Sequence, residues 1–415
     1  MFRRIAIFSL LVALVSTAAA QNDSILVVNK DTVAYRYTPI TQLPLQREKR
    51  NSGKGWQKFV NYIAESSIDS SFERRVDMTF IPSLYYTNST SLGLAVMAAG
   101  LYRLDKKSRD IPASNFSVYA TASLTGFYRV GVSGVNIFRK DRQRIVYNAE
   151  FYSQPTNFWG LGYDAAMDNG AMRYLASRCI VEGKFLQKIT KGLYVGVGAD
   201  YNYHFGKFGG KYASQAEFET LLNGYGVKYN ATGISLFVEY DTRDAISAPQ
   251  RGVYIAAQAK VRPRGMNNIG KTLWSGRLTL DYYQRLWKGA VLAFDLRGEY
   301  NSQGTPWVYY ATLGGLSSMR GYYAGRFTDL CAVTLQAELR QRIYKGFGAA
   351  AWGGAGNVFS TFGSFDWHKT LPTYGVGLRY ALKHGVNLRV DYGFGGRDHR
   401  GRLIHGAVFS FNEAF

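Results

Sequence analysis

The sequence predicts an all-β fold, a transmembrane antiparallel β-barrel of about sixteen strands. The composition suits strands and tight turns, because tyrosine (31), phenylalanine (25) and glycine (45) are abundant while proline (9) is scarce. Apolar and polar residues alternate through most of the chain, as they do along strands that face lipid on one side and a polar lumen on the other. Beyond the N-terminus, no segment has the roughly 18 consecutive apolar residues of a membrane helix.

Residues 1–20 have the pattern of a secretory signal peptide. Two arginines precede a short apolar run from Ile5 to Val15, and three alanines before Gln21 form a small-residue cleavage site. The alternative, an N-terminal membrane anchor, would need about 20 apolar residues, and this run is shorter. We therefore expect an exported protein.

Residues 21–75 differ from the rest of the chain because they are polar. The charged stretch "QREKRNSGKG" is followed by "WQKFVNYIAES", in which Trp56, Phe59 and Ile63 recur at helical spacing. We expect a periplasmic leader with one short amphipathic helix, and the alternative is an unstructured linker. The barrel is then expected over residues 76–415.

The period-two pattern is clearest in "AVLAFDLRGEY", residues 290–300, and it recurs in residues 332–343 and 385–395. A soluble sandwich would pack its apolar face on a second sheet, but here the polar faces are heavily charged and the segments are long. A closed barrel also leaves no exposed sheet edge, as a membrane requires. We expect outward, lipid-facing side chains at Leu292, Phe294, Leu335 and Leu388, and lumenal ones at Asp295, Glu338 and Arg389.

Sixteen segments carry this pattern, an even number of the kind that bacterial single-chain barrels have. They lie at residues 77–86, 91–104, 115–126, 127–139, 143–154, 177–189, 193–205, 231–242, 251–263, 274–287, 290–302, 332–343, 346–359, 372–383, 385–395 and 403–415. In the last segment Phe409, Phe411 and Phe415 share one face, which Glu413 interrupts.

The formal net charge is +21, and removal of Arg3 and Arg4 with the signal peptide leaves 21 − 2 = +19. The basic residues do not form one arm but recur singly inside the alternating segments. This distribution predicts a basic interior or rim that faces anionic lipid headgroups or acidic cargo. The aromatic residues follow the same period, so no nucleic-acid partner is expected.

Catalytic, metal and cofactor motifs are absent from the sequence. Asp366 and His368 lie near Ser364, and Asp398 precedes His399, but short glycine-rich stretches are more typical of turns than of a rim hydrolase. We therefore expect no enzyme activity, no metal and no cofactor. The two cysteines, Cys179 and Cys331, are no disulfide framework, and whether they form a single bridge stays open.

The stretch "GGLSSMRGYYAGRF", residues 314–327, suits neither a strand nor a helix. Its motif residues are Gly314, Gly315, Met319, Arg320, Gly321 and Tyr322. It resembles the RGY loop of BamA/TamA-type outer-membrane proteins, the bacterial surface antigen family. Residues 352–359 and 373–395 are similar to strands of that family. Residues 238–255 are similar to its hairpin motif, through Tyr240, Asp241, Arg243 and Asp244.

The resemblance implies that the loop folds from the rim into the lumen, where its arginine pairs with an acidic residue. Glu338 is the candidate partner because it has lumenal parity on the following strand, and a planar guanidinium can bind a carboxylate through two hydrogen bonds. Gly354 stands where the family often has an aspartate, so a greater dependence on Glu338 is expected. The alternative is an ordinary external loop with a solvated arginine.

The resemblance further implies a barrel in the outer membrane of a Gram-negative bacterium. Such a barrel would insert or translocate client proteins, or lipids, by lateral opening of the seam between its first and last strands. Pro82 weakens the first strand because it lacks a ladder donor, and the aromatic Phe415 would end the last strand. Residues 21–75 are too few for the family's POTRA domains, which leaves client capture unexplained. A passive pore or a surface scaffold is the alternative.

Overall fold

The computed structural model describes residues 75–87, 91–105, 113–222, 226–244, 248–344, 346–381, 387–398, 400–411 and 413–415. The expected signal peptide and, except for Arg75, the expected leader lie outside these residues and stay predictions. The elements below all belong to one compact unit, Asp69–Phe415. No helix in the described part of the chain is both long enough and apolar enough to cross a membrane.

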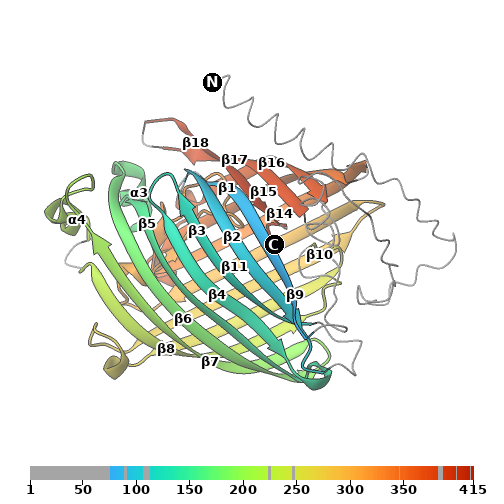
Figure 1. Cartoon of the computed structure of the whole chain (residues 1–415). Helices are drawn as coiled ribbons and strands as arrows, with labels where there is room; N and C mark the ends of the chain where they lie inside the picture. The colour runs from blue at the N-terminus through green and yellow to red at the C-terminus, as the bar shows by residue number, and fades with distance from the viewer. Residues whose placement is uncertain are drawn as a thin grey trace, which may run out of the picture. The chain divides into compact units, whose positions relative to one another are not determined.

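Sixteen antiparallel strands close into a barrel, which confirms the predicted fold class and strand number (Figure 1). The strands are β1 (Asp77–Thr87), β2 (Ser91–Tyr102), β3 (Ser114–Ser123), β4 (Tyr128–Ile137), β5 (Gln143–Phe158), β6 (Met172–Thr190), β7 (Leu193–Lys207), β8 (Lys228–Asp241), β9 (Gly252–Arg262), β10 (Leu273–Arg285), β11 (Ala290–Asn301), β14 (Cys331–Tyr344), β15 (Phe347–Phe359), β16 (Leu371–Ala381), β17 (Asn387–Arg397) and β18 (Leu403–Phe411). Each expected segment overlaps one strand, although β6 begins at Met172, five residues before the expected start.

The pleat of the wall separates the two kinds of side chain as the alternation predicts. Phe294 and Leu335 are 37% and 55% exposed on the outer face, whereas Asp295 and Glu338 are fully buried on the inner face. Arg389 is buried inside as well. Leu292 lies opposite Leu339 with outward parity, and the side chain of Leu388 is outside the described part of the chain.

The two ends of the barrel differ. At the end called here the turn end, strands are joined by short connections, such as residues 191–192 between β6 and β7. The opposite, loop end carries longer connections with α3 (Gly162–Asp168), α4 (Gln215–Leu222) and the two-stranded sheet of β12 (Ala311–Thr312) and β13 (Thr328–Asp329). Short 3-10 helices complete the connections: η2 (Arg139–Asp141), η3 (Arg264–Met266), η4 (Trp307–Tyr309), η5 (Phe362–Ser364) and η6 (Trp367–Lys369).

Residues 302–330, which connect β11 to β14, fold into the barrel and contact its wall on two sides. On one side Trp307 of η4 packs against Phe158 of β5 and Tyr174 of β6, with ring centroids 5.1 and 5.8 Å apart. Phe218 of α4 joins the same buried cluster.

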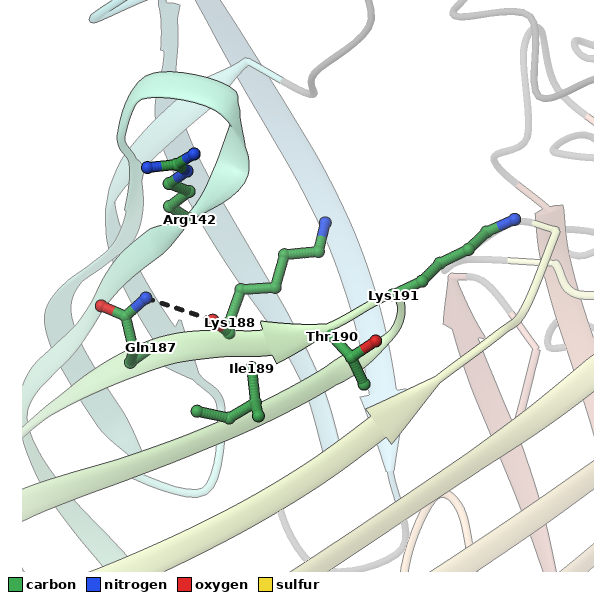
Figure 2. Close-up of a pocket in the computed structure, with 6 residues that line it drawn as sticks. All are labelled: Arg142, Gln187, Lys188, Ile189, Thr190 and Lys191. Carbon is green, nitrogen blue, oxygen red and sulfur yellow. Dashed lines mark hydrogen bonds between the residues drawn. The ribbon is translucent and has the colours of Figure 1, made fainter.

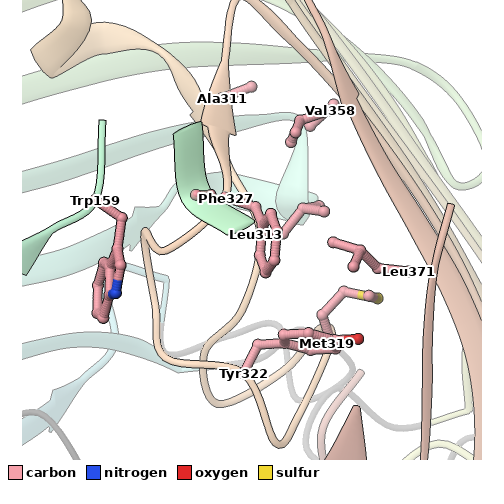
Figure 3. Close-up of a cluster of buried hydrophobic side chains, with 10 residues drawn as sticks. Trp159, Ala311, Leu313, Met319, Tyr322, Phe327, Val358 and Leu371 are labelled. Carbon is pink, nitrogen blue, oxygen red and sulfur yellow. The ribbon is translucent and has the colours of Figure 1, made fainter. Parts of the chain in front are cut away.

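On the other side the connection packs against β15 and β16. Figure 3 shows Leu313, Met319 and Phe327 gathered against Val358 of β15 and Leu371 of β16, all buried. Because β5 and β15 are eight strands apart in a ring of sixteen, they lie on opposite walls. Residues 302–330 therefore bridge the lumen from wall to wall.

Among the residues that the structure describes, β1 and β18 meet in register at one pair, Thr87 with Val408. By contrast, β1 pairs with β2 along eleven residues, Asp77 to Thr87. The described part of β1 is thus registered with β2 at eleven positions and with β18 at one. Pro82 lies opposite Val96 of β2, and continuation of the register of Thr87 with Val408 would place it beyond Phe411, where β18 ends.

Candidate functional site

Arg320 lies inside the wall and is fully buried. The backbone around it is tightly turned: Met319 has φ +50° and Gly321 has φ +108°, the left-handed region that glycine adopts most readily. Gln336 accepts a hydrogen bond from the main-chain N–H of Met319 (3.2 Å), and Thr373 donates one to the main-chain oxygen of Arg320 (2.9 Å). The loop is thus fastened to β14 and β16.

The Arg320 guanidinium contacts two carboxylates and one aromatic ring. Its Nη1 lies 2.6 Å from Oε2 of Glu338 and 2.8 Å from Oδ2 of Asp391. The guanidinium carbon lies 3.7 Å from the ring centroid of Trp352, a cation–π contact. The expected pairing with Glu338 is present, and the alternative of a solvated external arginine is not.

The geometry of the pairing differs from the expectation in one detail. The contact is not a two-nitrogen fork, because the same Nη1 serves both carboxylates while the ring of Trp352 covers the guanidinium. Asp391 of β17 supplies a second carboxylate that the sequence did not predict, and the expected greater dependence on Glu338 stays a prediction. An aspartate in place of Gly354 would not fit without a shift of its neighbours. Its Cβ would lie 2.8 Å from Cγ of Gln336 and would collide with the main chain of Leu335.

Further arginines surround the two carboxylates. Arg340 Nε lies 2.7 Å from Oε1 of Glu338, and Arg379 donates to both Asp391 and Glu338. Arg389 Nη1 lies 3.4 Å from Asp391, and its Nη2 donates to the main-chain oxygen of Leu316 in the loop (2.9 Å). We call this set the lumenal ion-pair network: Arg320, Glu338, Arg340, Arg379, Arg389, Asp391 and Glu413.

The segment after β18 joins this network, which corrects the expectation for Phe415. The final strand ends at Phe411 rather than at Phe415. Glu413 turns inward and lies 2.8 Å from Arg379 and 3.5 Å from Arg340. The main-chain oxygen of Phe415 accepts a hydrogen bond from Arg340 (2.7 Å). Glu413 and Phe415 thus contact the lumenal arginines, and Phe415 is not on the seam.

The hairpin motif is at the turn end and forms a separate structure. Asp241 accepts hydrogen bonds from the main chain and the guanidinium of Arg243 (3.0, 3.0 and 2.8 Å). Asp244 accepts two more from the main-chain N–H groups of Gln250 and Arg251. These bonds order the β8–β9 connection, while Tyr240 is 38% exposed at the end of β8. The motif therefore shapes a turn and does not reach Arg320.

The acid–histidine pair considered for a rim hydrolase does not form a catalytic triad with the nearby serine. His368 Nδ1 lies 3.1 Å from Asp366, but the His368 side chain is 98% exposed. The Ser364 hydroxyl bonds to Thr361 in a capping box instead. His399, the other candidate, lies outside the described residues. Cys179 and Cys331 are both free thiols, which answers the open question of a bridge.

Sequence reasoning missed Asp391, Trp352 and Arg379 as neighbours of Arg320. The signal for Asp391 was present, because it has the lumenal parity of Arg389 in "NLRVDYGF". Parity alone does not say which of several lumenal carboxylates lies at the depth of the loop. That depth is set by the register of β14 to β17.

The loop approaches β17 closely, and this contact can be tested by substitution. Gly321 and Gly393 meet backbone to backbone: a Cβ on Gly321 would lie 2.8 Å from the carbonyl carbon of Gly393. Gly393→Ala would push its methyl group into the main chain of Arg320, so we expect it to destabilise the barrel by about 1–3 kcal/mol. Urea titration of the folded barrel in detergent measures this. Gly353→Ala is the control, because a Cβ there meets nothing within 4 Å; equal losses in both variants would contradict the prediction.

A closed wall with an apolar outer face, and an arginine loop folded into the lumen, define a transmembrane β-barrel with a lumenal plug. A family model described as the Omp85 superfamily domain matches residues 70–415. The chain belongs to this superfamily, and the predicted BamA/TamA type is confirmed.

Solved structures share the fold at low sequence identity. BamA from Haemophilus ducreyi lacking POTRA domains 1–3 has a TM-score of 0.57 and 12% identity, over 81% of this chain and 70% of that chain. CdiB from Escherichia coli has a TM-score of 0.55 and 12% identity, over 81% of this chain and 63% of that chain. CdiB from Acinetobacter baumannii has a TM-score of 0.51 and 13% identity, over 82% of this chain and 60% of that chain. The chain thus spans less than two thirds of either CdiB chain. No curated protein matches the sequence.

Proposed function

We propose that this protein inserts or translocates client proteins at the outer membrane of a Gram-negative bacterium, by lateral opening between β1 and β18. The observation that carries the proposal is the seam, where the described residues of the two strands meet in register at one pair. The fold of BamA and CdiB supports the proposal, and the signal-peptide pattern is consistent with export. No covalent chemistry is needed, so we propose that the protein is not an enzyme.

The seam is weak along the turn-end part of β1. If the register of Thr87 with Val408 continued, Leu84 would face Phe411, the last residue of β18. Residues 77–83 of β1 therefore have no partner in β18. A net contribution of about 0.5–1.5 kcal/mol per hydrogen bond makes this the least costly place to separate neighbouring strands. It also leaves a strand edge to which an incoming strand could pair.

The inward turn of Glu413 supports the same mechanism. A longer β18 would extend the pairing with β1, but Glu413 is bound in the lumen by Arg379 and Arg340. The buried network thus fastens β14, β16 and β17 to the loop while the neighbouring seam stays short. Opening at one place requires a rigid wall beside a weak seam, because strain then concentrates at the seam.

The plugged lumen distinguishes this mechanism from a passive pore. Wild-type barrel in a planar bilayer is expected to show no steady open conductance, because residues 302–330 bridge opposite walls. Replacing residues 314–327 with a short Gly-Ser linker should open a stable channel, provided that the variant still shows the gel shift of a folded barrel. A wild-type conductance equal to that of the linker variant would favour the pore instead.

A further inference from the structure

A furrow crosses the outer face of β10, β11 and β14 near the loop end. Gly276 and Gly298 lie in it with outward parity, and Gly298 is flanked by Leu278 on one side and Val333 on the other. A Cβ on Gly298 would meet nothing within 4 Å, and a Cβ on Gly276 would meet the main-chain oxygen of Gln258 at 3.9 Å. The two missing side chains therefore leave open space in the lipid-facing surface.

Apolar side chains form the sides of this furrow, and main chain forms its floor. The outward side chains that line it are Leu278, Tyr300, Val333, Phe359 and Phe362. The other lining residues, Gln258, Arg277, Glu299 and Ala332, have inward parity and contribute main chain. The ion pair of Arg277 with Glu299 is thus on the lumenal face. The volume of the furrow, about 450 Å³, is in the range of small-ligand sites.

The β15–β16 connection folds over the outer face beside the furrow. Asn357 has the outward parity of Val333, and its side-chain amide donates to the main-chain oxygen of Asp366 (2.8 Å) and to the hydroxyl of Thr370 (3.0 Å). Phe362 of the same connection stacks on Tyr300 of β11, with ring centroids 5.8 Å apart and planes 9° from parallel. This connection therefore places an aromatic ring at one end of the furrow.

Aromatic side chains also show where the furrow lies in the membrane. Trp274 and Phe362 are 58% and 73% exposed at the loop end, where barrels have a girdle of aromatic residues at the lipid–water boundary. Leu278 follows Trp274 by four residues toward the turn end. The furrow thus begins at the girdle and continues on its hydrocarbon side.

A hollow at the turn end has a different character. Figure 2 shows Lys188 and Ile189, two of its lining residues, extending from opposite sides of β6. Lys188 has the inward parity of Leu186, whereas Ile189 is 61% exposed on the outer face. The lining of that hollow belongs to two faces of the wall, whereas the side chains that line the furrow share the outer face.

We propose that the furrow binds one acyl chain of a membrane lipid in the leaflet at the loop end, with Phe362 packed over the chain. Its apolar sides continue directly into the lipid-facing wall, and its charged lining residues point into the lumen. Main-chain pairing cannot fill it, because β11 is registered with both neighbours along eleven residues. The site depends on the barrel fold and is independent of whether the seam between β1 and β18 opens.

Contact number gives the chain its preference for this place. Inside a bilayer, lipid tails are as apolar as the wall, so van der Waals packing decides where a chain stays. A chain in the furrow gains roughly ten or more carbon contacts that a flat wall does not offer, which corresponds to a preference of at least about fivefold.

Photocrosslinking in nanodiscs tests the site with phosphatidylcholine that carries a diazirine in one acyl chain. Mass spectrometry compares adducts on Leu278 with adducts on Ile234 of β8, which is similarly exposed on the outer face (43% and 45%). As the fraction of the probe rises, labelling of Leu278 should saturate at one probe per barrel. Labelling of Ile234 should rise in proportion to the probe.

Two variants and two controls separate a bound chain from general lipid contact. Gly298→Leu fills the furrow and should weaken the saturable labelling at least about fivefold. Gly353→Leu is its control, because Gly353 of β15 is also outward and its Cβ would also meet nothing within 4 Å. Phe362→Ala should weaken the same labelling although it uncovers the furrow. Trp367→Ala, an exposed aromatic residue of the same connection, should not.

A gel shift confirms that each variant is folded, and Gly276→Leu, which fills the same furrow, repeats the test if Gly298→Leu does not fold. Several results would overturn the proposal: proportional labelling of Leu278 in the wild type, equal loss in the Gly298 and Gly353 variants, or stronger labelling in Phe362→Ala. A large difference between phosphatidylcholine and phosphatidylglycerol probes with the same chains would indicate a headgroup site instead. Protection of Leu278 in a dimer of barrels would indicate that a second copy covers the furrow.

Discussion

Replacing Arg320 with methionine is expected to destabilise the folded barrel by about 3–5 kcal/mol, the cost of leaving a buried charge without its partner. Arg320, Glu338 and Asp391 are all fully buried, so no solvent replaces the lost guanidinium. The neighbouring Arg340 and Arg379 still contact the carboxylates and set the effect toward the lower end of that range. Urea titration in detergent, followed by the gel shift of the folded barrel, measures the loss.

A double-mutant cycle tests whether the effect comes from the pair itself. Glu338→Gln alone should also destabilise the barrel, and the combined variant should be little worse than either single change. Strictly additive losses would contradict the pairing. Arg326→Met is the matched control, since this arginine of the same loop bonds to the main-chain oxygen of Ala166 rather than to a carboxylate.

Arg320→Lys separates the ion pairs from the aromatic contact. One nitrogen of Arg320 serves both carboxylates, so an ammonium group could retain part of that attraction. It would lose the planar contact with Trp352. We therefore expect the lysine variant to lie between wild type and methionine, and the difference from wild type to shrink when Trp352 is replaced by leucine.

Locking the seam is expected to abolish activity without affecting folding. Cysteines at Thr87 and Val408 would lie directly opposite each other in antiparallel strands, within reach of a disulfide. Cys179 and Cys331 are free and would first be replaced by alanine, so that only the engineered bridge can form. The readout is rescue of cells that have been depleted of the native protein, with and without a reductant.

The control places the same bridge where no opening is proposed. Ala95 of β2 lies opposite Thr121 of β3, inside a ladder that is paired along ten residues. This second bridge should leave rescue intact, and a reductant should restore rescue only in the seam variant. Normal rescue by the oxidised seam variant would rule out lateral opening as the mechanism.

The sequence by itself determined the wall of this protein. Successive side chains of a pleated strand point to opposite faces, and in a membrane barrel one face contacts lipid while the other faces a polar lumen. The local sequence was therefore enough to assign Phe294 and Asp295 to opposite faces. The glycines around Arg320 likewise indicated an unusual loop, and the lumenal parity of Glu338 was enough to name one partner.

Only the tertiary structure decided the rest of the site. Asp391 is 71 residues from Arg320, and its place beside the guanidinium depends on the registers of four strands and the depth of the loop. Glu413 lies beside Arg379 and Arg340, and no local pattern encodes this placement. Alternation can be recognised from neighbouring residues in the sequence. The partner of a buried charge lies across the lumen, and the stability of such a pair depends on both the distance between the charges and their desolvation.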